Sequence, residues 1–154
     1  MIQEYIASFK VIGISVRTTN ENNQAATDIP ALWERFMKEE IARQIPNKAG
    51  DDIYSIYTSY EKDHTRPYTT VLGCRVTSFD QVPSGMEALE IAAGNYACFT
   101  ATGKMSEGFV FNEWLKIWST PLPRKYTTDF EVYGAKAQDP EYAEVPIFIA
   151  LENE

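Results

Sequence analysis

The sequence predicts an α+β fold made of two β-α-β-β units, because one order of elements occurs twice along the chain. In each unit a strand precedes an apolar helix, proline closes the helix, and two further strands follow. We place these pseudo-repeats at about residues 7–78 and 86–152 of one domain, residues 1–154. Two such units can pair edge to edge, so we expect a curved, mainly antiparallel sheet with two helices and a central cleft.

The first unit holds three predicted strands and one helix. Gly13, at the centre of the first strand, indicates a bend or a close approach of another backbone. The helix begins near Thr27 with a capping side chain and Pro30 in its first turn, and we interpret Trp33 on its apolar stripe as core. His64, the only histidine, lies in a charged turn and is interpreted as a solvated loop residue. The predicted ranges are 9–17 (strand), 18–26 (loop), 27 to Pro46 (helix), 52–60 (strand), 61–67 (turn) and 68–78 (strand).

The second unit repeats this order after a connector that contains Pro83, Ser84 and Gly85. Its helix carries an unusually aromatic stripe, and Pro121 and Pro123 prevent the helix from continuing. We expect the last strand to be buried because it is almost wholly apolar. The predicted ranges are 87–92 (a short apolar alternation), 95–103 (strand), 105–118 (helix), 126–134 (strand) and 145–151 (strand).

The strand at residues 126–134 carries the strongest candidate for a functional side chain. Successive side chains of a strand point to opposite faces, so Phe130 and Val132 share one face while Glu131 and Tyr133 share the other. If Phe130 and Val132 pack on a helix, Glu131 is held on the reverse face of the sheet beside Tyr133. A carboxylate in an apolar, aromatic setting loses hydration and gains from a cation or a proton. Glu131 is therefore predicted to be a cation receptor at the floor of a hydrophobic pocket; the alternative is a solvated position on the surface.

Composition excludes several classes of function. The formal net charge of −8 repels phosphate backbones, so direct nucleic-acid binding is not expected. No signal peptide or apolar stretch of membrane-spanning length is present. Cys74 and Cys98 fall in predicted strands without metal spacing and indicate a reducing, cytosolic compartment. We expect no metal and no cofactor. The aromatic content of 13% is high, as in proteins whose aromatic residues line a ligand pocket.

Motifs spread over nearly the whole chain resemble those of the GyrI-like effector-binding domains. Such domains form the ligand-sensing half of AraC-type and MerR-type multidrug regulators and also occur as free-standing small proteins. The matching segments are Phe9–Gly13, Ile29–Trp33, Pro83–Gly85, Gly94–Tyr96, the pair Trp114 and Trp118, and Asp129–Tyr133.

The resemblance implies duplicated SHS2-type repeats that bind bulky, lipophilic cations, with Glu131 neutralising the charge of the ligand. It also implies a second acid, Glu144, at the edge of the pocket. Regulators of this family carry a helix-turn-helix domain before the effector domain, whereas the first strand here begins at residue 9. We therefore expect a stand-alone receptor for hydrophobic cations, acting alone, with a protein partner or as a homodimer. The predicted pocket walls are Tyr57, Phe99, Phe111, Trp114 and Tyr133.

Two other functions stay open from the sequence. Some GyrI-like proteins are similar to hydrolases of cytotoxic compounds, and Asp129 and Glu131 lie two apart on one strand face. That spacing lets one carboxylate raise the pKa of the other, as a general acid requires. Alternatively, an acidic chain of the gyrase-inhibitor type can occupy the basic surface of a protein partner. The sequence holds no Ser-His-Asp set, zinc spacing or phosphate-binding glycine loop.

Overall fold

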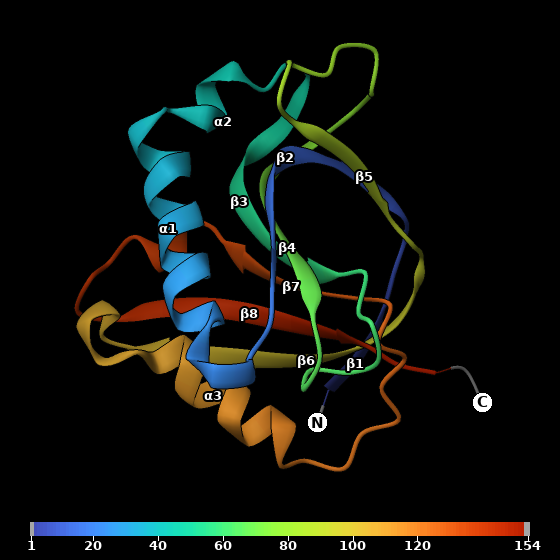
Figure 1. Cartoon of the computed structure of the whole chain (residues 1–154), viewed down its shortest axis with the longest axis vertical. Coiled ribbons are helices and arrows are strands. Elements are labelled where there is room, and N and C mark those ends of the chain that lie inside the picture. The colour runs from blue at the N-terminus through green and yellow to red at the C-terminus, as the bar shows by residue number, and fades with distance from the viewer. Residues whose placement is uncertain (1, 153–154) are drawn as a thin grey trace.

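The computed structural model describes residues 2–152, with only the backbone of Met105, and shows one curled sheet with helices on one of its faces (Figure 1). The α+β class predicted from the sequence is confirmed. The strands are β1 (Ile2–Ile6), β2 (Phe9–Thr18), β3 (Lys48–Thr58), β4 (Tyr68–Val76), β5 (Glu87–Ile91), β6 (Gly94–Gly103), β7 (Thr128–Tyr133) and β8 (Ala143–Ala150), and the α-helices are α1 (Ala25–Lys38), α2 (Ile41–Gln44) and α3 (Phe109–Trp118).

The strand order is β1-β6-β8-β7-β3-β4-β2-β5, and every adjacent pair is antiparallel. This order is symmetrical about the junction between β7 and β3, with four strands on each side. The arrangement agrees with two β-α-β-β units joined edge to edge. The sequence did not predict β1, and it gave β5 only as a short apolar alternation. Each of these strands extends the sheet of the other unit, because β1 pairs with β6 and β5 pairs with β2.

The helices differ from the prediction at their ends. Helix α1 begins at Ala25, so Pro30 lies inside the helix rather than in its first turn. Glu40 has a left-handed backbone (φ 50°) and separates α2 from α1, which gives three α-helices within residues 2–152 instead of two. Helix α3 begins only at Phe109, because Gly108 is also left-handed (φ 63°). Within this described part of the chain, no helix combines the length and the apolarity that crossing a membrane requires.

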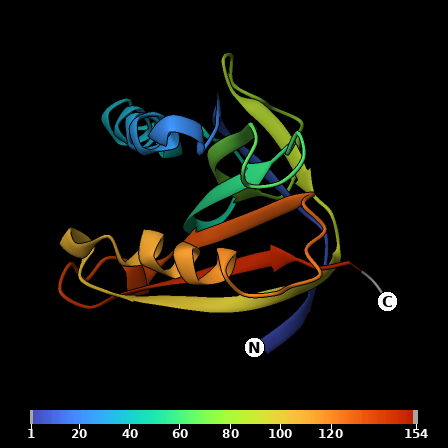
Figure 2. The same ribbon diagram turned by 60° about the horizontal axis from the view of Figure 1, so that its bottom comes forward.

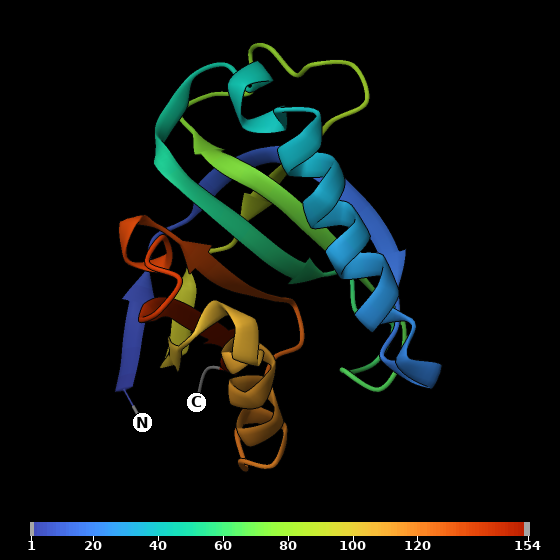
Figure 3. The same cartoon turned by 90° about the vertical axis from the view of Figure 1, so that its left-hand side faces the viewer.

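Helices α1 and α3 pack on separate arms of the curled sheet (Figures 2 and 3). Phe36 of α1 is buried against β2 and β4, and Ile117 of α3 is buried against β6 and β8. The other face of the sheet encloses a core of its own, in which the ring centroids of Phe130 and Phe9 lie 5.4 Å apart. The premise that Phe130 and Val132 pack on a helix therefore does not hold. The sheet curls enough to bury these side chains against its own strands, so the helices lie on the face of Glu131.

Two facing glycines bring strands β2 and β4 close together. Gly13 lies opposite Gly73 in the register of this pair. A Cβ atom at Gly13 would collide with the carbonyl oxygen of Leu72, and a Cβ atom at Gly73 would collide with that of Ile12. The close backbone approach that Gly13 predicted is confirmed, and it lets this arm of the sheet curl tightly beneath α1.

Candidate functional site

A cavity of about 440 Å³ lies where α1, α3 and the middle of the sheet meet. Helix α1 contributes Trp33, α3 contributes three aromatic rings, and the central strands β3 and β7 contribute tyrosines and Glu131. The volume falls in the range of pockets that hold drug-sized molecules, and most of the lining is apolar. The cavity is therefore a candidate site for one small, largely hydrophobic ligand.

Glu131 is the only acidic side chain that lines this cavity among the described residues, and it is 1% exposed. Its Oε2 accepts hydrogen bonds from Trp114 Nε1 at 2.5 Å and from the Tyr57 hydroxyl at 3.0 Å. Its Oε1 accepts a hydrogen bond from the Tyr133 hydroxyl at 2.8 Å. All three donors are neutral, and no lysine, arginine or histidine within residues 2–152 forms an ion pair with this carboxylate. Glu131 is a buried acid without a counter-ion.

The surroundings of Glu131 shift its protonation equilibrium. Burial raises the pKa of Glu131 above its usual value, because the charged form loses hydration, and the hydrogen bonds from Trp114, Tyr133 and Tyr57 offset part of this rise. The pKa of Tyr57 lies well above its usual value for the same reason, with a further contribution from the carboxylate. Tyr57 therefore stays a neutral donor. A proton or a cation close to Glu131 would relieve the cost of burying its charge.

Of the seven predicted site residues, the structure brings five to the cavity. These are Glu131, Tyr133, Trp114, Phe111 and Tyr57. The other two do not line it. Phe99 is half-buried on β6 and packs against the core beneath α3, and the Glu144 carboxylate lies 3.6 Å from Lys136 Nζ at the start of β8.

Several lining residues were missed or misjudged from the sequence. Trp33 was interpreted as core, but its ring is half-buried and meets the Tyr133 ring edge-on, at 4.7 Å between centroids. His64 was interpreted as solvated, yet it lines the cavity and stacks on Trp118 at 5.1 Å and 7°. Arg124 was not singled out at all. The high aromatic content of the chain could have signalled Trp33, whereas nothing signalled His64 or Arg124, because the loops that carry them have no periodic pattern.

Arg124 and Asp129 form a buried ion pair beside the cavity. The Arg124 side chain is 4% exposed, and its Nη2 lies 2.8 Å from Asp129 Oδ2. The Tyr60 hydroxyl donates to the same oxygen at 2.6 Å, and the Ala150 amide donates to Oδ1 at 2.9 Å. The guanidinium also stacks on the Tyr126 ring, 4.3 Å from its centroid. Arg124 lines the cavity whereas Asp129 does not, so Asp129 is occupied with structural hydrogen bonds.

The described residues contain no group of three or more His, Cys, Asp or Glu side chains that could hold a metal ion. Of the two cysteines, Cys74 is buried and Cys98 is half-buried, and both are free. The chemical groups that the cavity offers are aromatic faces, hydroxyl and indole donors, the amides of Asn20 and Asn23, the His64 imidazole, one carboxylate and one guanidinium.

The chain is similar to known proteins over almost its whole length. Residues 4–151 match the family Cass2, described as integron-associated effector binding protein. YobU of Bacillus subtilis (strain 168), whose name describes it as a candidate transcriptional regulator, is 31% identical over 145 residues that cover 92% of this chain and 91% of YobU.

Two solved structures extend this likeness to the fold. The integron cassette protein VCH_CASS2 from Vibrio cholerae is 33% identical with a TM-score of 0.77, over 98% of this chain and 95% of the other. SAV2435, solved with tetraphenylphosphonium bound, is 18% identical with a TM-score of 0.79, over 99% of this chain and 93% of the other. At that level of identity, SAV2435 shows a common fold.

Proposed function

Because the chain belongs to the family of integron-associated effector-binding proteins, we propose that it is a receptor for hydrophobic cationic small molecules, with Glu131 as the charge receptor. The family agrees with the resemblance to GyrI-like effector-binding domains, which is confirmed. The proposed ligand is a bulky, lipophilic cation that lies in the cavity between α1 and α3. Sensing or sequestration of such a compound is the proposed role.

The observation that carries the proposal is the state of Glu131. A carboxylate that is 1% exposed, with three neutral donors and no counter-ion in the described chain, carries a desolvation cost that its hydrogen bonds offset only in part. A ligand cation supplies the missing charge. A neutral ligand of the same shape leaves the cost in place, so the cavity favours a cation.

The walls of the cavity support the same ligand class. Trp33, Phe111, Trp114 and Trp118 offer aromatic faces, and a cation over such a face gains about 0.5–2 kcal/mol. Apolar walls stabilise a ligand through the apolar surface that it buries, and this stabilisation depends little on the orientation of the ligand, which suits a receptor that accepts several compounds. The fold neighbour SAV2435 was solved with tetraphenylphosphonium, a lipophilic cation of this kind.

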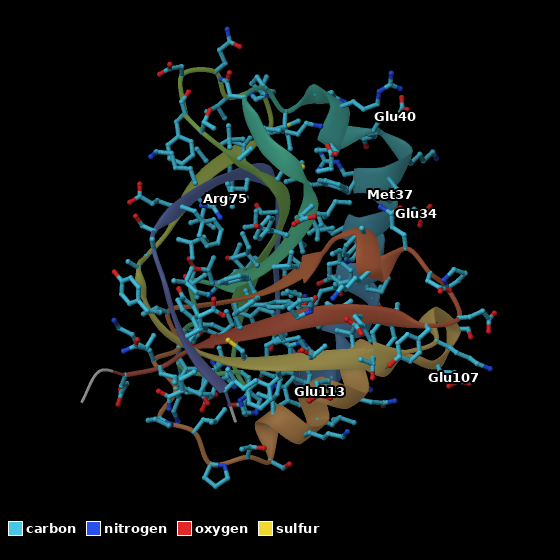
Figure 4. All side chains as sticks on the ribbon, turned by 180° about the vertical axis from the view of Figure 1, so that it is seen from behind. Glu34, Met37, Glu40, Arg75, Glu107 and Glu113 are labelled. Carbon is cyan, nitrogen blue, oxygen red and sulfur yellow. The ribbon has the colours of Figure 1, made fainter. Side chains whose placement is uncertain are left out.

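The two alternative functions have weaker support. Catalysis by Asp129 with Glu131 requires both carboxylates in the cavity, whereas Asp129 is held by Arg124, Tyr60 and the Ala150 amide. Mimicry of nucleic acid requires one contiguous acidic face. Figure 4 shows Glu34 and Glu40 on the arm of the molecule that carries α1, and Glu107 and Glu113 on the arm that carries α3. These four acidic side chains are therefore divided between the two arms.

The experiment is a titration of tryptophan fluorescence with tetraphenylphosphonium and with tetraphenylborate, which share a shape but have opposite charges. Trp33, Trp114 and Trp118 line the cavity, so a bound ligand should quench their emission. We expect saturable quenching by the cation and much weaker binding of the anion. Equal affinity for the two ions would overturn the proposal of a cation receptor.

A further inference from the structure

The wall of the cavity holds a second polar region, which we call the donor region: Arg124, His64 and Trp118. Arg124 is 8% exposed overall, and two of its nitrogens, Nε and Nη1, are buried without a hydrogen-bond partner among the described residues. The same holds for Trp118 Nε1 and for His64 Nδ1, which is a donor or an acceptor according to the tautomer of the imidazole. All three side chains line the cavity. Buried donors are rarely left unpaired in native proteins, and each one costs about 1–3 kcal/mol.

The donor region is one connected group of side chains. The Arg124 guanidinium stacks on the ring of Tyr126. The centroid of the His64 ring lies 6.5 Å from that of Tyr126, and the His64 ring also stacks on Trp118. Burial lowers the pKa of His64, and the nearby Arg124 charge lowers it further, so the imidazole stays neutral. Asp129 compensates the positive charge of Arg124 through its contact with Nη2, while Nε and Nη1 have no hydrogen-bond partner among the described residues.

The donor region and Glu131 belong to the same cavity but do not pair with each other. Glu131 takes its hydrogen bonds from Trp114, Tyr57 and Tyr133, while Arg124 donates to Asp129. The wall between the two regions is aromatic: the rings of Trp114 and Trp118 are neighbours, 6.2 Å apart. Among the described residues, one ligand in this cavity can therefore meet a carboxylate without a counter-ion at one place and nitrogens without hydrogen-bond partners at another.

We propose that the donor region is a subsite for an oxygen acceptor of the ligand, a carboxylate or a carbonyl, so that the cavity selects cations that also carry an acceptor group. This inference rests on the proposed function and adds a requirement to it, namely that the ligand carries an acceptor oxygen as well as a positive charge. The cationic part of the ligand lies against Glu131, its aromatic body lies between the indoles, and its acceptor oxygen receives a hydrogen bond from one of the unpaired donors, Arg124 Nε, Arg124 Nη1 or Trp118 Nε1. A hydrogen bond that joins a charged donor to a carboxylate is shorter and stronger than a neutral one, so a carboxylate suits the Arg124 donors well.

The test uses three xanthylium dyes that share one cationic ring system. Tetramethylrosamine has no acceptor on its pendant phenyl ring, the methyl ester of tetramethylrhodamine adds a carbonyl, and tetramethylrhodamine adds a carboxylate. Binding of each is measured by dye fluorescence anisotropy. We expect at least one acceptor-bearing dye to bind about tenfold or more tightly than the rosamine, and comparison of ester with acid identifies the acceptor.

Variants of Arg124 separate recognition from structure. Arg124→Lys keeps a positive charge beside Asp129 but removes the two unpaired nitrogens, Nε and Nη1, and Arg124→Gln with Asp129→Asn keeps a hydrogen-bonded pair without buried charge. Both should remove the preference for the acceptor-bearing dyes while the rosamine still binds. The control is Arg75→Lys, since Arg75 stacks over Phe9 at 4.8 Å outside the cavity and is exposed (Figure 4). This control should leave all three affinities unchanged.

The outcomes distinguish this inference from the proposed function. Rosamine binding that weakens in Glu131→Gln, together with equal affinities for all three dyes in the wild type, would overturn the acceptor subsite and leave the cation receptor intact. An equal loss for all three dyes in both Arg124 variants would show that Arg124 only holds the fold. Failure of every dye to bind would refute both proposals.

Discussion

Replacement of Glu131 by glutamine removes the buried charge while it preserves the contacts of the side chain. The amide oxygen can take the place of Oε2 and accept from Trp114 and Tyr57, and the amide nitrogen can donate to the Tyr133 hydroxyl. The variant should therefore fold. Because it no longer buries a carboxylate without a counter-ion, its free energy of unfolding at pH 7 should equal or exceed that of the wild type.

The expected loss of cation affinity follows from the contact that disappears. Tetraphenylphosphonium has no hydrogen-bond donor, so its attraction to Glu131 is Coulombic, and at about 6–10 Å with an effective dielectric constant of about 20 it amounts to roughly 1.5–3 kcal/mol. Since 1.4 kcal/mol corresponds to a factor of ten, the dissociation constant for tetraphenylphosphonium should rise about 10- to 150-fold. The loss should be absent for tetraphenylborate, whose negative charge gains nothing from Glu131. Titration of tryptophan fluorescence with each ion gives both values.

A matched control removes one surface acid. Glu34 is exposed on α1, so Glu34→Gln changes the net charge by the same amount without touching the cavity. It should leave both affinities unchanged. The charge-receptor role would be refuted if Glu131→Gln weakened the two ions equally, or if Glu34→Gln weakened the cation as much as Glu131→Gln did.

Three further results are expected. The pKa of Glu131 is raised, so at pH values between its ordinary and its raised pKa the native state holds a proton that the unfolded chain has lost. As pH rises through this window, the contribution of Glu131 to the free energy of unfolding should fall and the affinity for the cation should rise. Urea unfolding and fluorescence titration at each pH should show both trends in the wild type and neither in Glu131→Gln. Asp129→Ala should lower the free energy of unfolding by about 3–5 kcal/mol in urea, because it leaves Arg124 buried without its partner; a loss below about 1 kcal/mol would contradict this. Gly13→Ala should lower the melting temperature, because its Cβ atom collides with the Leu72 carbonyl; an unchanged melting temperature would show that the strands can separate at no cost.

The fold could be predicted from the sequence because its main elements are periodic. The apolar stripe of α1, the aromatic stripe of α3 and the alternation of β7 each have a clear signature, and together they give the duplicated order. The points at which helices and strands begin and end were not predictable in the same way. Glu40 and Tyr126 adopt left-handed backbones (φ 50° and 56°) although neither is glycine, so nothing in the sequence marks the end of α1 or the late start of β7.

The candidate site could be predicted only where it lies on regular elements. Tyr57, Trp114, Glu131 and Tyr133 belong to strands or a helix whose alternation or stripe selects a face. The side chains of His64 and Arg124 come from irregular segments and reach the cavity only because the sheet curls. The direction of that curl also decided which face of β7 meets the helices. Gly13 indicated a bend or a close approach, but the alternation of side chains along β7 does not give the direction in which the sheet curls, so the sequence assigned the wrong packing to Phe130.

The most direct measurement of the central claim is a crystal structure of the protein with tetraphenylphosphonium. We predict that the cation lies in the cavity between α1 and α3, against the Glu131 carboxylate, with its phenyl rings among Trp33, Trp114 and Trp118. Glu131 should keep its hydrogen bonds from Tyr57 or Tyr133. A cation bound elsewhere on the molecule, or one in the cavity that avoids Glu131, would contradict the account.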